Sequence, residues 1–232
     1  LNNTKDRILS VIGHDLRNPI GNVKSFLDLI EESPDDFNKE DILRMIKTAS
    51  ESAGQSLFIL DNLLSWSRAQ LGMTVSEASS FKIWDAVETN IHLLKPMAEK
   101  KNIQIINKTD VKLLINADIN MTQIILRNLI SNAIKFTNPG GQIKIGNSIN
   151  NDKKEALIKI CDNGIGMTEE ELRAIKEGKT LLSKEGTSKE KGNGIGLFLC
   201  REFIEKHHGK LLIESKKNTG SCFSFNMPIS QI

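Results

Sequence analysis

Two long apolar stripes near the start of the chain constrain the fold more than any other feature of the sequence. The first stripe consists of Leu9, Ile12, Leu16, Ile20, Val23, Leu27 and Ile30. The second consists of Ile42, Ile46, Ala49, Ala53, Leu57, Leu60 and Leu64. Steps of three and four residues place each stripe on one face of an α-helix. The breaker cluster Ser33-Pro34-Asp35-Asp36 separates the stripes, so the pattern predicts a helical hairpin.

A hairpin of this size cannot enclose a hydrophobic core by itself. We expect the first helix to run from near Thr4 to about Glu32, with a kink at Pro19, and the second to continue toward Leu71-Gly72. Each helix is then about 28 residues and roughly 40 Å long, but the two form only one layer. Pairing two hairpins into a four-helix bundle buries both stripes. Residues 1–72 are therefore predicted to form a homodimer.

The pattern changes beyond Gly72, where a polar linker precedes short β-like runs and further helices. Branched and aromatic residues that concentrate or alternate predict strands at 103–106, 113–116, 142–147, 156–161, 210–214 and 222–227. Helical patterns cover 83–100, 119–136, 168–177 and 194–208. This order predicts an α/β sandwich with a mixed, mostly antiparallel sheet for residues 73–232.

Composition excludes several classes of protein. The 232 residues carry a formal net charge of +2 and no basic stripe of the kind that nucleic acid requires. No apolar run approaches the roughly 20 residues that span a bilayer. We therefore expect no membrane contact by this chain, which we interpret as a fragment whose parent protein can be membrane-anchored. The apolar surroundings of Cys161, Cys200 and Cys222 indicate buried free thiols and a reducing, cytoplasmic compartment.

The first predicted helix displays a reactive pair in the segment Gly13-His14-Asp15-Leu16-Arg17-Asn18-Pro19-Ile20. His14 lies two residues from both Ile12 and Leu16, so at about 100° per residue it points about 160–200° away from the stripe. This geometry excludes a core histidine. An imidazole beside the carboxylate of Asp15 in water is either surface decoration or a site of chemistry, and the residues alone leave both interpretations open.

A second group of polar side chains lies on the helix predicted at 119–136. Asn128, Asn132 and Lys135 are spaced by four and three residues and share one helical face. Amide oxygens are hard ligands that suit Mg²⁺, and an ammonium provides a point charge for phosphates. The face therefore suits a Mg²⁺-bound polyphosphate, and the competing interpretation is a solvated amphipathic face.

Two glycine-containing segments complete a candidate nucleotide pocket. In Asp162-Asn163-Gly164-Ile165-Gly166-Met167, a carboxylate at a strand end can accept from an exocyclic amine, and glycines let the backbone approach a flat ring. In Gly192-Asn193-Gly194-Ile195-Gly196-Leu197, glycines before a helix expose N–H groups to phosphate oxygens. The loop from Glu177 to Lys191, which contains Gly186-Thr187, is predicted to be a mobile lid. Taken singly, each glycine segment could be only a turn.

Together these segments resemble, in order and spacing, the motifs of sensor histidine kinases of two-component systems. GHDLRNPI resembles the H box of that family, NLISNAIKFT the N box, DNGIGM the first glycine box and GNGIGL the second, and the ending GSCFSFNMP is similar to the last strand. The resemblance implies a dimerisation and histidine phosphotransfer hairpin followed by a GHKL-type ATP-binding domain, the fold shared with gyrase, Hsp90 and MutL. It also implies ATP and Mg²⁺ as cofactors and the receiver domain of a response regulator as partner.

For the H box, the resemblance implies that His14 is the phosphoacceptor and Asp15 its acid/base partner. The chemistry agrees, because a neutral imidazole must attack the γ-phosphorus in line and a neighbouring carboxylate can orient the ring and stabilise the developing imidazolium. Asn18 lies one turn after His14 on nearly the same face. In resembling kinases a Thr or Asn there positions water for dephosphorylation of the regulator, which implies a phosphatase activity as well. No acceptor role is implied for the remaining histidines, which we interpret as structural or solvated: His92, His207 and His208.

For the nucleotide boxes, the resemblance implies that Asn132 and Asn128 bind Mg²⁺. It implies that Lys135 contacts phosphate and that Asp162 reads the adenine amine. The other implied ATP-binding residues are Phe136, Gly164, Gly166, Thr187, Gly192, Gly194, Gly196 and Leu197. Hydrolysing relatives in this superfamily carry a glutamate base at the position of Asn128, and an amide cannot activate water in that way. This difference favours transfer to His14 over ATP hydrolysis.

The sequence departs from the family pattern in two places. Asp15 and Asn18 replace the Glu and Thr of many H boxes with residues of the same chemical type. Before the second glycine box, Leu181-Leu182 stands where many relatives have a phenylalanine pair, which leaves lid packing and a basic phosphate contact from Lys184 or Lys189 open. The sequence predicts a protein-histidine kinase, and the alternatives are a non-catalytic dimeric signalling module and a GHKL-type ATPase that drives conformational change.

Overall fold

The structure, a computed structural model, describes residues 2–33, 37–70, 78–150, 152, 154–177, 185–188, 190 and 195–230. Within these ranges it describes the side chains of all residues except 2–12, 14, 15, 51, 55, 58, 59, 61, 62, 65–70 and 195. The chain divides into two compact units, Leu1–Met73 and Thr74–Ile232. The first is a helical hairpin and the second is an α/β sandwich.

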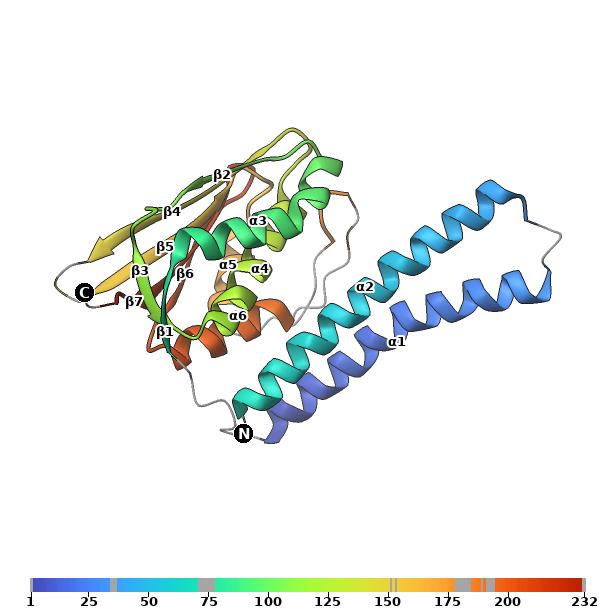
Figure 1. Cartoon of the computed structure of the whole chain (residues 1–232), viewed down its shortest axis with the longest axis horizontal. Helices are drawn as coiled ribbons and strands as arrows, with labels where there is room; N and C mark the ends of the chain where they lie inside the picture. The colour runs from blue at the N-terminus through green and yellow to red at the C-terminus, as the bar shows by residue number, and fades with distance from the viewer. Residues whose placement is uncertain are drawn as a thin grey trace. The chain divides into compact units, whose positions relative to one another are not determined.

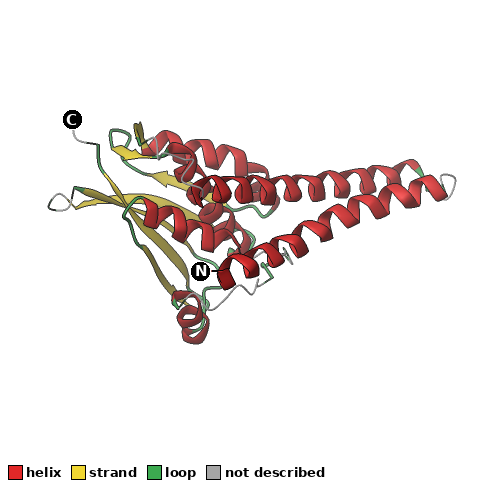
Figure 2. Cartoon of the chain, turned by 90° about the horizontal axis from the view of Figure 1, so that it is seen from below, coloured by secondary structure: helices red, strands yellow, loops and turns green. Residues whose placement is uncertain are grey.

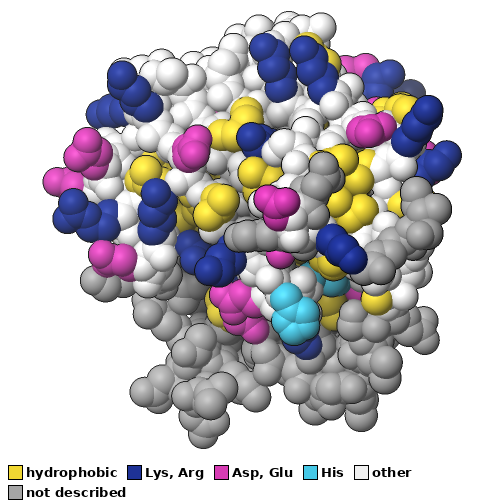
Figure 3. Space-filling model, turned by 90° about the vertical axis from the view of Figure 1, so that its left-hand side faces the viewer, with side chains coloured by type: hydrophobic (Ala, Val, Ile, Leu, Met, Phe, Trp, Pro, Cys, Tyr) yellow, Lys and Arg dark blue, Asp and Glu magenta, His cyan; other side chains and the backbone are white. Residues whose placement is uncertain are grey.

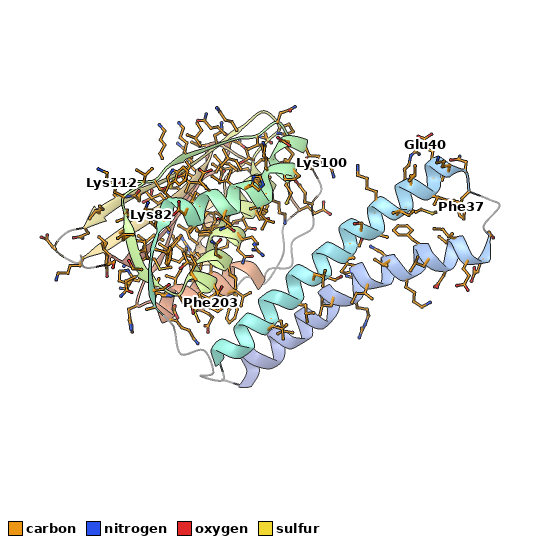
Figure 4. The ribbon with its side chains drawn as sticks, viewed as in Figure 1. Phe37, Glu40, Lys82, Lys100, Lys112 and Phe203 are labelled. Atoms are coloured by element: carbon orange, nitrogen blue, oxygen red, sulfur yellow. A yellow bond between two sulfur atoms is a disulfide. The ribbon has the colours of Figure 1, made fainter. Side chains whose placement is uncertain are left out.

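The hairpin consists of two long helices, α1 (Asn2–Glu32) and α2 (Lys39–Gln70), which pack against each other (Figure 1). Asn38 caps α2, because its side-chain oxygen accepts hydrogen bonds from the backbone N–H groups of Glu40 (2.9 Å) and Asp41 (3.0 Å). Figure 4 labels Glu40 at this end of the hairpin. A second contribution to helix stability is the exposed i,i+4 ion pair between Arg44 and Glu40.

Large apolar side chains remain exposed on a single hairpin. They are Ile20, Leu27, Leu29, Leu43, Ile46, Leu57, Leu60 and Leu64. Their exposed fractions range from 41% at Leu60 to 61% at Leu57, whereas a helix packed on both sides of its stripe would bury most of this surface. One hairpin therefore covers only part of each stripe and leaves an apolar surface that a further helical layer would bury.

The second unit is a sandwich of one sheet and one layer of helices (Figure 2). Its main sheet has the strand order β2–β4–β5–β7–β6, with β2 at Gln104–Lys108, β4 at Gln142–Asn150, β5 at Glu155–Asp162, β6 at Leu211–Lys216 and β7 at Gly220–Pro228. The neighbours β2 and β4 are parallel and the other neighbours are antiparallel. The predicted mixed, mostly antiparallel sheet is confirmed. A separate antiparallel pair joins β1 (Ser79–Lys82) to β3 (Leu114–Ala117).

The helices α3 (Ile83–Lys100), α4 (Ile119–Phe136) and α6 (Ile195–Lys206) lie along one face of this sheet (Figure 1). A shorter helix, α5 (Glu169–Lys176), follows β5. Alternate strand residues such as Ile158 and Ile160 are buried toward the helices, whereas Lys144 on the opposite face is exposed. Phe203 of α6, labelled in Figure 4, is fully buried in this core.

The start of α4 is held by two side chains. Asp118 caps the helix, because its Oδ1 accepts from the backbone N–H groups of Asn120 (2.8 Å) and Met121 (3.1 Å). The backbone N–H of Asp118 in turn donates to Nε2 of His207 (3.0 Å), whose Nδ1 lies 2.6 Å from the carbonyl oxygen of Phe203. Burial lowers the pKa of His207, although the Phe203 carbonyl and the Asp118 carboxylate oppose this shift. The interpretation of His207 as a structural histidine is confirmed.

The prediction of three free thiols is wrong for two of the cysteines. Cys161 on β5 and Cys222 on β7 form a disulfide, while Cys200 is free and buried as predicted. Cys161 and Cys222 lie directly opposite each other in the antiparallel register, so their side chains share one face of the sheet. The pairing depends on strand register between segments 61 positions apart, which local sequence does not reveal. The inference of a reducing compartment from three free thiols therefore loses its basis.

The surface charges and the hydropathy of the helices agree with what the composition predicts. On the face drawn in Figure 3, Lys and Arg side chains are interspersed with Asp and Glu and with small hydrophobic areas. This mixture matches the formal net charge of +2 and produces no large field of one sign on that face. Within the described ranges, none of the helices combines the length and the apolar character that crossing a bilayer requires.

Candidate nucleotide-binding site

The C-terminal end of α4 is the point where the parts of the candidate site meet. The last four carbonyl groups of a helix have no partner within it. In residues 133–136 they accept hydrogen bonds, in order, from the backbone N–H of Thr137 (3.0 Å), the ammonium of Lys101 (2.8 Å), the backbone N–H of Thr187 (3.0 Å) and the backbone N–H of Ile165 (3.0 Å). Beyond the cap residue Thr137, the donors come from the turn after α3, the predicted lid and the first glycine box. Three separate segments are therefore hydrogen-bonded to the C-terminal end of α4.

Asn128 and Asn132 present two carboxamides one turn apart on α4. Asn128 is 5% exposed, and its Nδ2 donates to the carbonyl of Ile124 (2.9 Å). This bond turns Oδ1 toward the start of α6, where a Cβ added to Gly196 would collide with that oxygen. Asn132 is half-buried. The structure thus brings Asn128 of the predicted N box and Gly196 of the second glycine box together.

These amides test whether the site suits a divalent cation. Among the described residues, no group of three or more His, Cys, Asp and Glu side chains is placed to hold a metal ion. The Oδ1 of Asn128 receives no hydrogen bond from the described residues and is a hard oxygen donor. Mg²⁺ commonly keeps one or two protein ligands and takes the rest from phosphates and water. The donor set of Asn128 and Asn132 therefore fits an ion held mainly by a polyphosphate.

Lys135 and Phe136 form the last turn of α4. Lys135 is 8% exposed, and its ammonium lies 4.8 Å from the centroid of the Phe136 ring. Burial lowers the pKa of Lys135, while the nearby carboxylates of Glu190 and Glu185 oppose this shift. A desolvated ammonium gains more from an incoming anion than an exposed one does. The setting of Lys135 therefore favours its predicted role as a phosphate contact.

Asp162 lies at the end of β5, on the helix side of the sheet. Its Oδ1 accepts hydrogen bonds from the backbone N–H groups of Gly164 (2.9 Å) and Ser221 (3.2 Å). Burial raises the pKa of Asp162, and hydrogen bonds from the backbone N–H groups of Gly164, Ser221 and Asp162 itself oppose this shift. Among the described residues, no donor from another residue reaches Oδ2. This oxygen is the free acceptor that an exocyclic amine requires.

The two glycines of the first glycine box lie where a side chain does not fit. A Cβ at Gly164 would collide with the carbonyl of Phe136 at the end of α4. Gly166 has φ +60°, and a Cβ there would collide with the carbonyl of Lys216. The loop after Asp162 is therefore pressed against both α4 and the β6–β7 turn, which fixes the carboxylate relative to the N box.

The described part of the predicted lid, residues 185–188 and 190, packs on the end of α4, and we call it the lid foot. Gly186 leaves no room for a side chain, because a Cβ would collide with Glu190 and lie 2.6 Å from Cγ of Lys135. The Thr187 hydroxyl donates to the carbonyl of Thr137 (2.8 Å). Leu197 is half-buried near the start of α6. Several predicted lid and phosphate-loop residues lie outside the described residues: Leu181, Leu182, Lys184, Lys189, Gly192 and Gly194.

The H-box segment is part of α1 in the other unit. Asn18 is exposed on this helix, as the phosphatase prediction requires. Pro19 lies inside the helix and is buried. The side chains of His14 and Asp15 are outside the described residues, so the predicted direction of the imidazole stays a prediction.

Lys101 is the part of the site that sequence reasoning missed. Its ammonium contacts the end of α4 and two lid-foot side chains, and the residue is only 6% exposed. A signal was present, because Lys101 continues the buried stripe of α3 at steps of three and four after Asn90, Leu94 and Ala98. A lysine in that series indicates a buried cation with partners.

Comparison with known proteins agrees with this geometry. Residues 4–72 match the family described as "His Kinase A (phospho-acceptor) domain". Residues 117–231 match the family described as "Histidine kinase-, DNA gyrase B-, and HSP90-like ATPase". The chain belongs to the histidine kinases. The phosphoacceptor domain comes first in this kinase core and contains the H box. The ATPase domain follows and contains the nucleotide boxes.

Individual relatives and solved structures are similar to the chain over nearly its whole length. The adaptive-response sensory kinase SasA of Crocosphaera subtropica is 27% identical over 234 residues, which cover 97% of this chain and 59% of that relative. The Acinetobacter baumannii histidine kinase AdeS has the same fold, with a TM-score of 0.69 at 16% identity over 94% of this chain and 98% of that chain. Histidine kinase ThkA, solved in complex with response regulator protein TrrA, gives a TM-score of 0.64 at 23% identity over 97% of this chain and 61% of that chain. The kinase core thus spans little more than half the length of SasA.

Proposed function

We propose that this chain is the catalytic core of an ATP-dependent kinase that phosphorylates its own His14 and passes the phosphoryl group to an aspartate of a response regulator. The observation that carries the proposal is the meeting of an amide pair, a desolvated lysine and the carboxylate of Asp162 around the end of α4. The same chain carries the H-box histidine on α1. Residues 1–72 would provide dimerisation and phosphotransfer, and residues 73–232 would bind ATP.

ATP would lie along the exposed end of this arrangement, with its base at β5 and its phosphates at α4 and α6. The free Oδ2 of Asp162 accepts from the adenine amine. The ammonium of Lys135 and the backbone N–H groups at the start of α6 attract the phosphates. Asn128 and Asn132 are the side chains that would hold Mg²⁺, which would supply positive charge to the phosphates.

The phosphoryl transfer itself requires little from the protein beyond positioning and charge. A neutral imidazole of His14 attacks the γ-phosphorus in line, the bond from that phosphorus to the bridging oxygen breaks, and ADP leaves. The carboxylate of Asp15 orients the ring and stabilises the imidazolium that forms. The ammonium of Lys135 stabilises the negative charge of the transferred phosphoryl group.

Asn128 supports transfer rather than hydrolysis. It occupies the position where hydrolysing members of the superfamily are expected to carry a glutamate base, and its amide nitrogen is committed to the carbonyl of Ile124. An amide does not accept a proton from water at neutral pH. Without a base in this place, water competes poorly with the imidazole of His14 for the γ-phosphoryl group.

The hairpin supports two partners for the kinase core. Its exposed apolar side chains, such as Leu43, Ile46 and Leu57, would be buried by a second copy in a four-helix bundle. The solved complex of ThkA with the response regulator TrrA supports a receiver domain as the second partner. Exposed Asn18 would position water to dephosphorylate that regulator. ATP dependence favours a cytoplasmic location for this part of the protein.

Labelling with γ-³²P ATP tests the proposal. Incubation of the chain with labelled ATP and Mg²⁺ should give a phosphoprotein that is stable to base and labile to acid. The label should be absent from His14→Gln and unchanged in His92→Gln, because His92 is an exposed histidine on α3. Acid-stable label, or label that persists in His14→Gln, would show that another residue is the acceptor.

Two further measurements separate the alternatives. Failure of calorimetry to detect Mg-ATP binding would favour a non-catalytic dimeric signalling module. Steady phosphate release that is unaffected by His14→Gln would favour an ATPase that drives conformational change. The site around Asn128, Lys135 and Asp162 supports binding, and the amide at Asn128 argues against rapid hydrolysis.

A further inference from the structure

A buried ammonium joins the lid foot to the end of α4. The side chain of Lys101 is 7% exposed, and its Nζ donates to the carbonyls of Ile134 (2.8 Å) and Lys135 (3.0 Å). It also donates to the hydroxyl of Thr187 (2.6 Å) and to the carboxylate of Glu190 (2.9 Å). The three N–H groups of an ammonium are thus shared among four oxygen atoms from two segments.

The ammonium of Lys101 is electrostatically complementary to both the end of α4 and the lid foot. The last carbonyls of a helix carry partial negative charge, so a positive group at the end of α4 is stabilised there. Glu190 supplies the balancing anion, and burial would raise the pKa of Glu190, but the hydrogen bonds from Lys101 and from backbone N–H groups hold it below its usual value. The buried ammonium needs these oxygen partners, and its charge in turn holds the partly exposed Glu190 carboxylate against the end of α4.

The same contact continues into the phosphate-binding residues. The carbonyl of Lys135 accepts from Lys101 and also from the backbone N–H of Thr187 (3.0 Å). The Oε2 of Glu190 accepts from the backbone N–H of Ser188 (2.8 Å), which closes the lid foot on itself. Lys101 therefore holds the backbone of Lys135 and the lid foot in one arrangement.

We propose that Lys101 is a positioning residue for the kinase reaction, which clamps the lid foot to the end of α4 and thereby preorganises the phosphate side of the ATP site. The inference rests on the proposed kinase function. Lys101 does not contact the reacting atoms in this scheme. Its ammonium acts through Thr187, Glu190 and the backbone of Lys135.

Loss of the clamp should release the lid foot before it unfolds the domain. The side chain of Glu190 is 30% exposed, so this carboxylate can move into water once its partner is removed. The released foot then populates arrangements that do not bind phosphate. Because apparent affinity falls with the fraction of molecules in the binding-competent state, ATP binding weakens, and saturating ATP selects the competent arrangement again.

The test is the steady-state rate of His14 phosphorylation by the whole chain as a function of ATP concentration. Lys101→Met keeps the length of the side chain and removes the ammonium. It should raise the KM for ATP about tenfold or more, the effect of losing a charged hydrogen bond, and change kcat by less than about threefold. Lys112→Met, at an exposed lysine labelled in Figure 4, is the matched control and should leave both constants unchanged.

Two milder variants keep the proposal testable if Lys101→Met does not fold. Thr187→Val removes one oxygen from the clamp, and Glu190→Gln keeps the acceptor atom but removes its charge. Each should raise the KM for ATP by about threefold with kcat retained. Folding of every variant is checked by thermal melting of the nucleotide-free protein.

The outcomes distinguish a positioning role from a purely structural one. A lower melting temperature of Lys101→Met with an unchanged KM would show a merely structural lysine and overturn the inference. The same holds if both milder variants leave KM unchanged. A wild-type chain that forms no acid-labile phosphoprotein overturns the proposed function instead, because that result does not depend on Lys101.

Discussion

Substitution of Asp162 by Asn should change which base the kinase core binds. Oδ1 of Asp162 already accepts the backbone N–H groups of Gly164 and Ser221, and the new amide oxygen must remain there to satisfy both. Its NH₂ group then takes the place of Oδ2 and faces the adenine amine, donor against donor. The lost bond to a charged acceptor contributes about 1.5–3 kcal/mol, so the Kd for Mg-ATP should rise about 10-fold to 150-fold.

The base of ITP provides the contrast, because its hypoxanthine ring carries an oxygen acceptor where adenine carries the amine. The amide in Asp162→Asn can donate to that oxygen, so the ratio of ITP affinity to ATP affinity should rise in the variant. Calorimetric titration with each nucleotide measures both changes, and Asp152→Asn, at an exposed carboxylate, is the control. The fold should tolerate the change, because burial raises the pKa of Asp162 and a neutral group removes that cost. An equal loss of both nucleotides, or no loss of ATP, refutes this role of the carboxylate.

Three further predictions concern packing, pH and assembly. Gly196→Ala should lower Mg-ATP affinity at least about tenfold by displacing Asn128, whereas Gly146→Ala, whose new Cβ meets nothing closer than Cβ of Lys108 at 4.0 Å, should bind normally by calorimetry. Because burial lowers the pKa of His207, its contribution to the free energy of unfolding is present above about pH 6.5 and is lost as the pH falls below that value. Urea unfolding at several pH values should show a weaker dependence of the free energy of unfolding on pH for His207→Gln than for the wild type. An identical pH dependence contradicts the assignment. Ile46→Lys should raise the dissociation constant of the dimer on the order of 100-fold, as measured by analytical sedimentation. Thr48→Lys, at a residue that is also exposed on α2, should leave this constant unchanged.

The sequence predicted the elements whose signals are local. The bounds of α3 and α4 agree with the predicted 83–100 and 119–136, because Asp118 is a strong N-cap and the apolar period of both helices is clear. The strand β1 at Ser79–Lys82 was missed, because four residues with one aromatic side chain show no alternation and the strand exists through its pairing with β3.

The candidate site divides along the same line. Asn128, Lys135 and Asp162 could be predicted as candidates because short motifs carry their chemistry, and their roles stay predictions. Lys101 and the Cys161–Cys222 disulfide were not predicted, because each depends on contacts between segments far apart in sequence. Position 101 follows the buried stripe of α3, but the four oxygen partners of its lysine come from α4 and the lid foot.

If ATP binds as proposed, the end of α4 would link the two halves of the nucleotide. The carbonyl of Phe136 accepts from the loop that follows Asp162, and the neighbouring carbonyl of Lys135 accepts from the lid foot. A shift of this single turn would move both the loop after Asp162 and the lid foot, so base recognition and lid placement would share one free energy of coupling. Such coupling is reciprocal: a lid foot held in place tightens the hold on adenine, and bound adenine steadies the lid foot by the same factor. With ATP bound as proposed, the kinase core would distinguish a whole ATP molecule from its parts through cooperativity within one helical turn.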